Sequence, residues 1–262
     1  FPYYYAFALA PAAPLAGLFY DRLTSPVRKS LHRGPLLPAS LILMLGATLA
    51  LNVQRASPDF QAAQRQLLRI VHETFREPVL YMDGYGMVGS FPRASFFMSS
   101  WGMENYVAAG RPFFSGAVLD APPLLVVANS PELADALLPE RAIAAPRIAL
   151  LDADIRYLRE NYRPYWGVIF LPGRQIADDA AEEDRRFPIA VAGSYRLTAA
   201  AAVILDGRSV APGAVISLER GSHRLDGPLP PGGVALDWAA VPPAPSEQPI
   251  DLKPFTSFVR AR

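Results

Sequence analysis

The stretch Pro78–Gly89, "PVLYMDGYGMVG", joins a short apolar run to three glycines and decides how the first half of the chain is interpreted. Residues 84–89 match the spacing G-x-G-x-x-G, which in dinucleotide-binding proteins connects a strand to a helix. That motif requires a helix that begins on the glycines, because the pyrophosphate binds the free N–H groups of the first helical turn. Here Pro92 follows, and proline disfavours helical geometry in the residue before it. The pattern therefore predicts a buried strand and a tight glycine turn, and no dinucleotide site.

Helices and short apolar strands alternate on both sides of this stretch. Before it, apolar residues recur at helical spacing as far as Phe75, after Ser57 as N-cap and Pro58 as first helical residue. After it, Ser130-Pro131 marks another helix start. We expect buried strands at 79–83, 122–130 and 165–171, and further helices within 103–110 and 151–164. This order indicates an α/β layer built largely on parallel pairing.

Two long windows near the beginning of the chain carry no charged side chain. Residues 1–20 and 34–53 each comprise 20 uncharged residues, and a helix of that length spans about 30 Å, the thickness of the hydrocarbon layer of a bilayer. Between them, residues 21–33 carry four cations against one anion, as expected of a cytoplasmic loop. We therefore predict a membrane hairpin with the remaining chain outside the cytoplasm. The alternative is a pair of buried core helices.

The second half of the chain changes character. Residues 173–192 are charged and without periodicity, and their acidic cluster has no accompanying histidine, so a solvated linker is favoured over a metal site. From Gly193 onward, short β-type runs separated by turn residues such as Asp206-Gly207 predict about five antiparallel strands. The proline-rich residues after 240 are expected to be extended and to lie over the preceding parts.

These patterns together predict an α/β protein with five segments. We expect a membrane helical hairpin at residues 1–56 and a small three-layer α/β domain at 57–172. A charged linker at 173–192 is followed by a small antiparallel β-sandwich at 193–240 and a proline-rich tail at 241–262.

Composition limits the chemistry further. The chain has no cysteine, which removes thiolate metal ligands and disulfides, and a net charge of +1, which argues against a nucleic-acid partner. Its three histidines, His32, His72 and His223, are scattered, so no metal ligand set or Ser-His-Asp arrangement is supported. We therefore predict no metal, no cofactor and no catalytic residue.

The densest group of candidate binding residues lies in residues 81–114, which we call the aromatic segment. Aromatic residues, methionines and glycines are concentrated there with a few charges. The members best suited to contact a ligand or partner are Asp83, Arg93, Trp101, Glu104 and Tyr106. In the alternative interpretation, its aromatic side chains complete the core or lie against a membrane surface. That alternative concerns Phe91, Phe96, Phe97 and Trp101.

Two parts of the sequence resemble one protein family. The beginning, "FPYYYAFALAPAAPLAGLF", is similar to a late membrane segment of the bacterial GT-C glycosyltransferases, which are related to protein mannosyltransferases and aminoarabinose lipid A transferases. The aromatic segment, together with "PPLLVVANSPEL" and "NYRPYWGVIFLPG", is similar to the extracytoplasmic C-terminal domain of members of that superfamily. The likeness covers most of residues 1–172 and, more loosely, the β-rich part.

The resemblance implies an inner-membrane glycosyltransferase that moves a sugar from a polyprenyl-phosphate donor to a glycan or protein acceptor in the periplasm. The family places its catalytic Asp or Glu in the first extracytoplasmic loop, so we expect this chain to be the C-terminal part of a longer protein. Tyr3, Tyr4 and Tyr5 match a region near the lipid carrier. Two alternatives stay open: a non-catalytic, membrane-anchored periplasmic binding or assembly module, and a soluble enzyme with a nucleotide fold.

Overall fold

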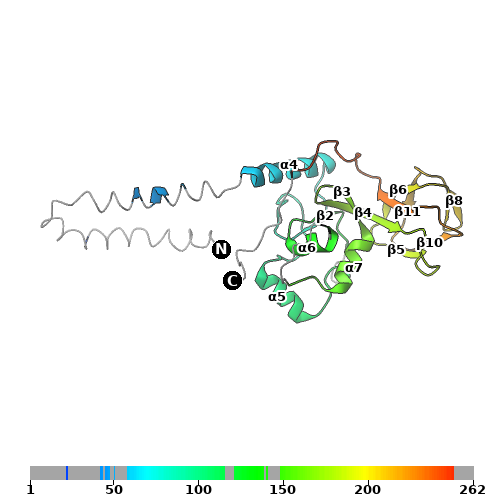
Figure 1. Ribbon diagram of the computed structural model, residues 1–262, viewed down its shortest axis with the longest axis horizontal. Coiled ribbons are helices and arrows are strands. Elements are labelled where there is room, and N and C mark those ends of the chain that lie inside the picture. Colours follow the sequence, from blue (N-terminus) through cyan, green and yellow to red (C-terminus); the bar gives the residue numbers. More distant parts are fainter. Residues whose placement is uncertain are drawn as a thin grey trace. The chain divides into compact units, whose positions relative to one another are not determined.

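The computed structural model describes residues 22, 42–43, 45–47, 50, 58–115, 121–138, 140 and 148–250. Contacts divide the chain into two units, residues 1–58 and 59–262, and almost all described residues belong to the second (Figure 1). The first expected membrane span, residues 1–20, lies outside the described residues, and of the second, residues 34–53, the structure describes 42–43, 45–47 and 50. Among the residues that are described, we find no helix with the length and apolar composition needed to cross a bilayer.

The first long element of the second unit is helix α4 (Pro58–Thr74), as the sequence predicts. Its apolar face repeats every three or four residues and is buried at Ala63, Leu67, Ile70 and Val71. The other face is exposed to solvent. Since a short isolated helix is marginal in water, packing of this face is what holds α4 in place.

A seven-stranded mixed sheet forms the centre of the unit (Figure 1). Its strands follow the order β1-β2-β4-β11-β6-β9, and β3 pairs with β4 beside this path. The strand bounds are β1 (Tyr81–Asp83), β2 (Leu125–Val127), β3 (Tyr162–Trp166), β4 (Ile169–Ile176), β6 (Gly193–Ala199), β9 (Val215–Leu218) and β11 (Val234–Trp238). Helices α5 (Ser100–Ala109), α6 (Pro131–Leu137) and α7 (Asp152–Asn161) connect the early strands. The expected mixed α/β class is confirmed.

The expectation of largely parallel pairing is wrong. Among the described strands, only β1 and β2 are parallel, and the other strand pairs run antiparallel. The stretch 165–171, expected to be one strand, instead contains a tight turn at Gly167, after which Ile169 pairs back onto Trp166. A connection this short permits only antiparallel neighbours, since parallel strands need a long crossover.

The β-rich half contains a second, four-stranded antiparallel sheet in the order β5-β10-β7-β8. Its strands are β5 (Arg186–Ile189), β7 (Val203–Leu205), β8 (Arg208–Val210) and β10 (Gly221–Asp226). The predicted Asp206-Gly207 turn joins β7 to β8, and both residues have the positive φ, 50° and 73°, that two-residue hairpins favour. Residues 193–240 hold six strands where about five were expected.

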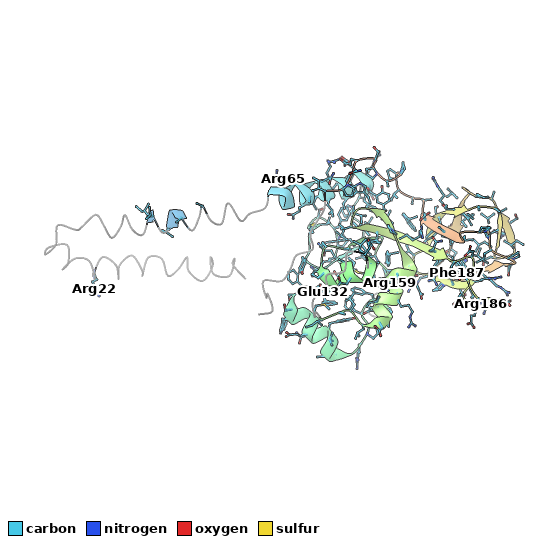
Figure 2. All side chains as sticks on the ribbon, in the orientation of Figure 1. Arg22, Arg65, Glu132, Arg159, Arg186 and Phe187 are labelled. Carbon is cyan, nitrogen blue, oxygen red and sulfur yellow. The ribbon has the colours of Figure 1, made fainter. Side chains whose placement is uncertain are left out.

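The structure also differs from the expected segment boundaries. The boundary expected after residue 172 falls inside strand β4. Pro172 lies in register opposite Tyr162 of β3, and β4 then continues and pairs with β11. Strand β5 lies inside the stretch expected to be a linker. In β5, Arg186 is exposed and Phe187 is fully buried (Figure 2), which is the alternation of a strand with one face on a core.

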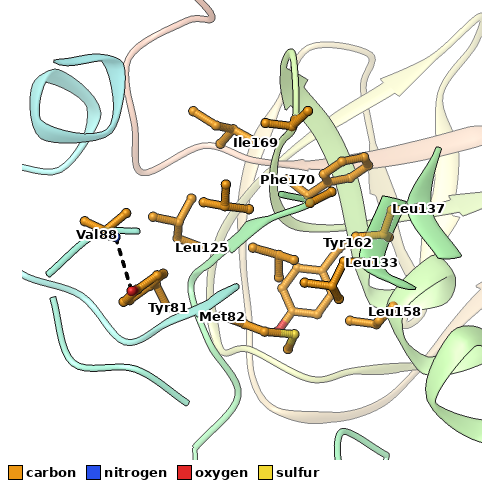
Figure 3. Close-up of a cluster of buried hydrophobic side chains, with 14 of the residues drawn as sticks. Tyr81, Met82, Val88, Leu125, Leu133, Leu137, Leu158, Tyr162, Ile169 and Phe170 are labelled. Atoms are coloured by element: carbon orange, nitrogen blue, oxygen red, sulfur yellow. Dashed lines mark hydrogen bonds between the residues drawn. The ribbon is translucent and has the colours of Figure 1, made fainter. Parts of the chain in front are cut away.

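Buried side chains form two clusters, and β4 contributes to both. Ile169 and Phe170 pack into the cluster of the α/β half, while Ile176 belongs to the cluster of the β-rich half. In the first cluster, Tyr81 and Tyr162 are among the large side chains that surround β1 and β2 (Figure 3). Burial of each such side chain contributes about 1.5–3 kcal/mol. Because β4 supplies buried side chains to both clusters, it couples the stability of the two halves.

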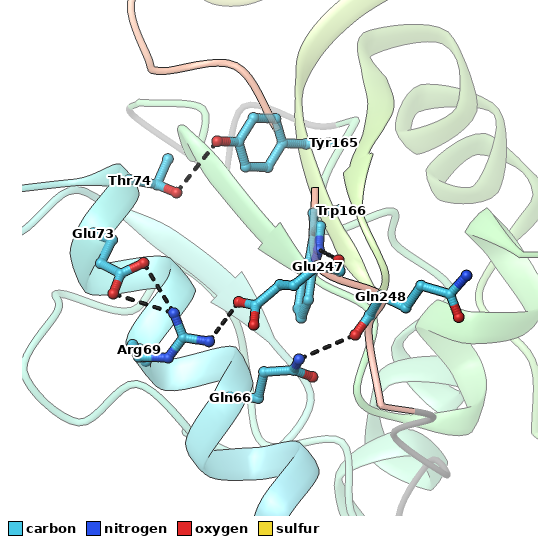
Figure 4. A network of polar contacts seen from close by, with 8 residues as sticks. All are labelled: Gln66, Arg69, Glu73, Thr74, Tyr165, Trp166, Glu247 and Gln248. Carbon is cyan, nitrogen blue, oxygen red and sulfur yellow. Dashed lines mark hydrogen bonds and ion pairs between the residues drawn. The ribbon is translucent and has the colours of Figure 1, made fainter. Parts of the chain in front are cut away.

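The tail returns along the α/β half, as expected for residues up to 250. The Trp166 indole N–H donates to the Glu247 carbonyl at 2.9 Å, and the Gln66 amide donates to the Gln248 carbonyl at 3.1 Å (Figure 4). Arg69 of α4 pairs with the Glu247 carboxylate. The tail therefore ties α4 to the β3–β4 turn.

An ion pair between Asp206 of the β7–β8 turn and His223 of β10 makes stability depend on pH. His223 Nδ1 lies 2.6 Å from the Asp206 carboxylate, and Nε2 lies 2.8 Å from the Glu219 carbonyl, so only the protonated ring donates to both. Partial burial lowers the pKa of His223, but these two hydrogen bonds raise it more, and the net pKa lies above its ordinary value of 6.5.

We predict that this pair stabilises the fold by about 1 kcal/mol or less. The stabilisation is fully present below the ordinary histidine pKa of about 6.5 and disappears as the pH rises through the higher pKa of the folded state. Urea unfolding of the chain from pH 5 to 9 measures it. The Asp206→Asn variant keeps a residue that tolerates positive φ and should flatten the pH dependence. Stability that increases with pH more in the wild type than in this variant would contradict the assignment.

Candidate functional site

The parallel pair β1–β2 creates the polar centre of the α/β half. Because the two strands run in the same direction, their carboxyl ends lie together, and Asp83 at the end of β1 meets Asn129 just after β2. Ligands of α/β proteins commonly bind at this edge of the sheet. Asp83 and Asn129 are 0% and 1% exposed, so the edge is covered by the chain itself.

The Asp83 carboxylate is fully engaged by the loop that follows it. Its Oδ1 accepts the N–H of Gly86 at 2.8 Å, and its Oδ2 accepts the N–H of Met87 at 2.6 Å. The Asn129 side chain donates to the same Oδ2 at 3.0 Å and accepts the N–H of Gly84 at 2.9 Å. The Ser95 hydroxyl donates to the Asp83 carbonyl at 2.6 Å. These bonds close the glycine loop onto the ends of both strands.

Two glycines of the G-x-G-x-x-G stretch are required by this geometry. Gly86 has a φ of 74°, which side chains rarely adopt. At Gly84 a Cβ atom would lie 2.3 Å from the Cβ of Ser130, so no larger residue fits. No helix follows these glycines directly, since the next one, α5, begins at Ser100. The expected glycine turn is therefore confirmed, with positive φ at Gly86.

Tyr81 of β1 forms a further hydrogen bond to the glycine loop. Its hydroxyl accepts the N–H of Val88 at 3.2 Å (Figure 3). Burial, with a smaller contribution from the charge of Asp83, raises the pKa of Tyr81 to about 12. The tyrosine is thus a neutral hydrogen-bonding group at physiological pH.

A second buried carboxylate, Asp154, fixes the other end of the aromatic segment. It lies in the first turn of α7 and is 0% exposed. Its Oδ1 accepts the N–H groups of Phe114 and Ser115, both at 2.8 Å, and its Oδ2 accepts the N–H of Phe113 at 2.7 Å and the hydroxyl of Tyr106 at 2.6 Å. Asp154 is not predicted from the sequence, because an acid in the first helical turn is ordinary and only the fold supplies its partners.

The candidate Tyr106 belongs to this buried network. Its hydroxyl also accepts the N–H of Leu151 at 2.9 Å, and its ring stacks on Phe96 with centroids 5.1 Å apart. Burial, then the hydrogen bond to Asp154, raises the pKa of Tyr106 well above its ordinary value of 10. Tyr106 links α5, α7 and the aromatic segment.

The remaining candidate binding residues that the structure describes have side chains exposed to solvent. Trp101 is 75% exposed and Glu104 is exposed on the same side of α5, while Met103 and Tyr106 face the core. The Arg93 guanidinium lies over the Phe97 ring, 5.7 Å from its centroid. The structure thus brings Asp83 and Tyr106 into two separate buried networks and leaves Trp101 and Glu104 outside them. Tyr3, Tyr4 and Tyr5 lie outside the described residues.

The aromatic side chains divide between the two alternatives given by the sequence. Phe91 is 7% exposed and meets Phe75 and Tyr81 edge to face, and Phe96 packs against the core. Phe97 is 42% exposed. Phe91 and Phe96 therefore complete the core, whereas Phe97 and Trp101 are exposed.

This geometry indicates positioning rather than proton transfer. A general base needs an oxygen within hydrogen-bond reach of the substrate, and both Asp83 and Asp154 are enclosed and occupied by donors of the chain. Comparisons of the chain with protein-family models, curated proteins and solved structures gave no match in any of the three.

We predict that Asp83→Asn destabilises the protein by about 3 kcal/mol, because an amide replaces an acceptor-only group opposite two N–H groups. Glu104→Gln, a matched change of an exposed acid, should alter the free energy of unfolding by less than about 0.5 kcal/mol. Urea unfolding of both variants measures the difference. An Asp83→Asn variant as stable as the wild type would show that these bonds do not hold the loop.

Proposed function

We propose that the chain is the C-terminal portion of an integral membrane glycosyltransferase that uses a polyprenyl-phosphate-linked sugar, with a non-catalytic periplasmic part that assists acceptor or donor binding. In this proposal residues 1–56 form the membrane hairpin, followed by a three-layer α/β part and a β-sandwich. The resemblance of the sequence supports the transferase, and the enclosure of Asp83 and Asp154 supports a non-catalytic role for the periplasmic part. Both buried acids shape the aromatic segment and neither is available to a substrate.

The beginning of the chain supports the membrane hairpin. The described residues of the second expected span, among them Ile42, Leu43 and Leu45, are helical. Their side chains are 70%, 77% and 58% exposed. Exposed apolar residues on a helix are favourable where lipid covers them. The cationic stretch 21–33 supports a cytoplasmic loop between the spans.

A second function, a membrane-anchored binding or assembly module without transferase activity, is favoured by the same enclosure of the acids. The two differ in whether the chain contacts a polyprenyl phosphate. A photoreactive polyprenyl-phosphate analogue should crosslink to the chain in membranes, with competition by unlabelled polyprenyl phosphate and not by phosphatidylglycerol. Equal competition by both lipids would favour the assembly module.

We predict the topology from single-cysteine labelling, which is possible because the chain has no cysteine of its own. A membrane-impermeant maleimide added to intact spheroplasts should label Ala202→Cys, in the exposed β6–β7 turn, and should label Ser30→Cys only after permeabilisation. If Ala202→Cys also required permeabilisation, the periplasmic location would be contradicted.

A further inference from the structure

We infer that the outer face of α5 contacts the lipid bilayer, and this inference rests on the membrane hairpin of the proposed function. The outer face comprises Trp101, Glu104 and Ala108 on the helix, and the exposed Phe97 lies in the loop that precedes it. Trp101, Glu104 and Ala108 follow one another at spacings of three and four residues, so they line one side of α5. The buried Met103 and Tyr106 occupy the opposite side.

The face combines exposed apolar groups with neighbouring cations. Among the described residues of the second unit, the large exposed apolar side chains are few, and Phe97, Trp101 and Val107 gather on or next to α5. Arg93 lies against Phe97, and Arg111 is exposed just beyond the end of the helix. Glu104 is the acid of this surface. Tryptophan with flanking arginine is the combination that favours the boundary between lipid tails and headgroups.

The rigid attachment of α5 suits such a contact. Its N-cap Ser99 accepts the N–H of Gly102 at 3.2 Å, and Gly110 ends it in the left-handed conformation. On the inner side, the Tyr106 hydroxyl is fixed by Asp154. The exposed side chains are therefore presented by a helix that is capped at both ends and anchored to the core.

The chain connection limits the distance between the expected membrane hairpin and the start of α4. The expected second span ends at residue 53, and residues 54–57 then reach at most about 18 Å to the start of α4, whatever their conformation. In Figure 1 the beginning of α4 and helix α5 lie at the same end of the second unit, and β8 and β10 lie at the opposite end. A hairpin in the bilayer would keep the start of α4 within this reach of the lipid, and α5 lies at the same end of the second unit.

The test uses the full chain in vesicles of phosphatidylethanolamine and phosphatidylglycerol mixed at about 3:1. An environment-sensitive fluorophore is placed at Ala108→Cys on the outer face or, as matched control, at Ala202→Cys next to β7. Both are exposed alanines. Doxyl-labelled phospholipid should quench the fluorophore at residue 108 at least about twofold more strongly than at residue 202.

A further variant combines Trp101→Glu with the labelled Ala108→Cys. This variant should reduce the quenching at residue 108 to the level of the Ala202→Cys control. Equal quenching at residues 108 and 202 would overturn the inference and would indicate that a protein or glycan covers this face. Flotation after alkaline carbonate extraction of the same vesicles tests the hairpin separately. A chain that stays in the membrane without quenching at residue 108 contradicts only the contact of α5, and a chain that is extracted contradicts both.

Discussion

The structure of the α/β half depends on a buried carboxylate. Asp83 is excluded from solvent, and removing an ionisable group from water is costly unless its oxygens are hydrogen-bonded. Here the N–H groups of Gly86 and Met87 and the side chain of Asn129 supply those bonds. One residue therefore fixes the glycine loop, the ends of two parallel strands and the beginning of the aromatic segment. Asp154 does the same at the far end through three successive N–H groups and the hydroxyl of Tyr106.

These two constraints explain how a segment with little regular secondary structure presents a defined surface. Between them, the inner aromatic residues, such as Phe91 and Phe96, pack into the core. Trp101 is left outside on a helix that cannot rotate without breaking the Tyr106–Asp154 bond. In the proposed function the acids act indirectly, by setting which side chains face outward. This division of roles is the basis of the proposed non-catalytic, membrane-adjacent module.

Local signals in the sequence predicted the elements well and their pairing poorly. Ser130-Pro131 correctly marked the start of α6, and Asp206-Gly207 correctly marked a hairpin, because capping and positive φ are properties of adjacent residues. The β3–β4 hairpin was missed because a single glycine in an apolar run does not show that the chain reverses. Asp154 was missed for a related reason, since its partners lie 39 to 48 residues away and only the fold brings them together. Asp83 was found as a polar residue after a strand, but its enclosure by Asn129 depends on the β1–β2 pairing.

The measurement that tests the central claim most directly is amide hydrogen exchange of the full chain, with residue-level detection at the N–H groups bound to the two acids. Gly86, Met87, Phe113, Phe114 and Ser115 lie outside helices and strands. If the acids hold the segment, these amides should exchange as slowly as those of β1 and β2, by a factor of about 10³ or more relative to an unprotected amide. Asp83→Asn should reduce the protection of the amides of residues 86 and 87 more than that of the amides of residues 113–115. Exchange of all five amides at the rate of an exposed loop would contradict the account.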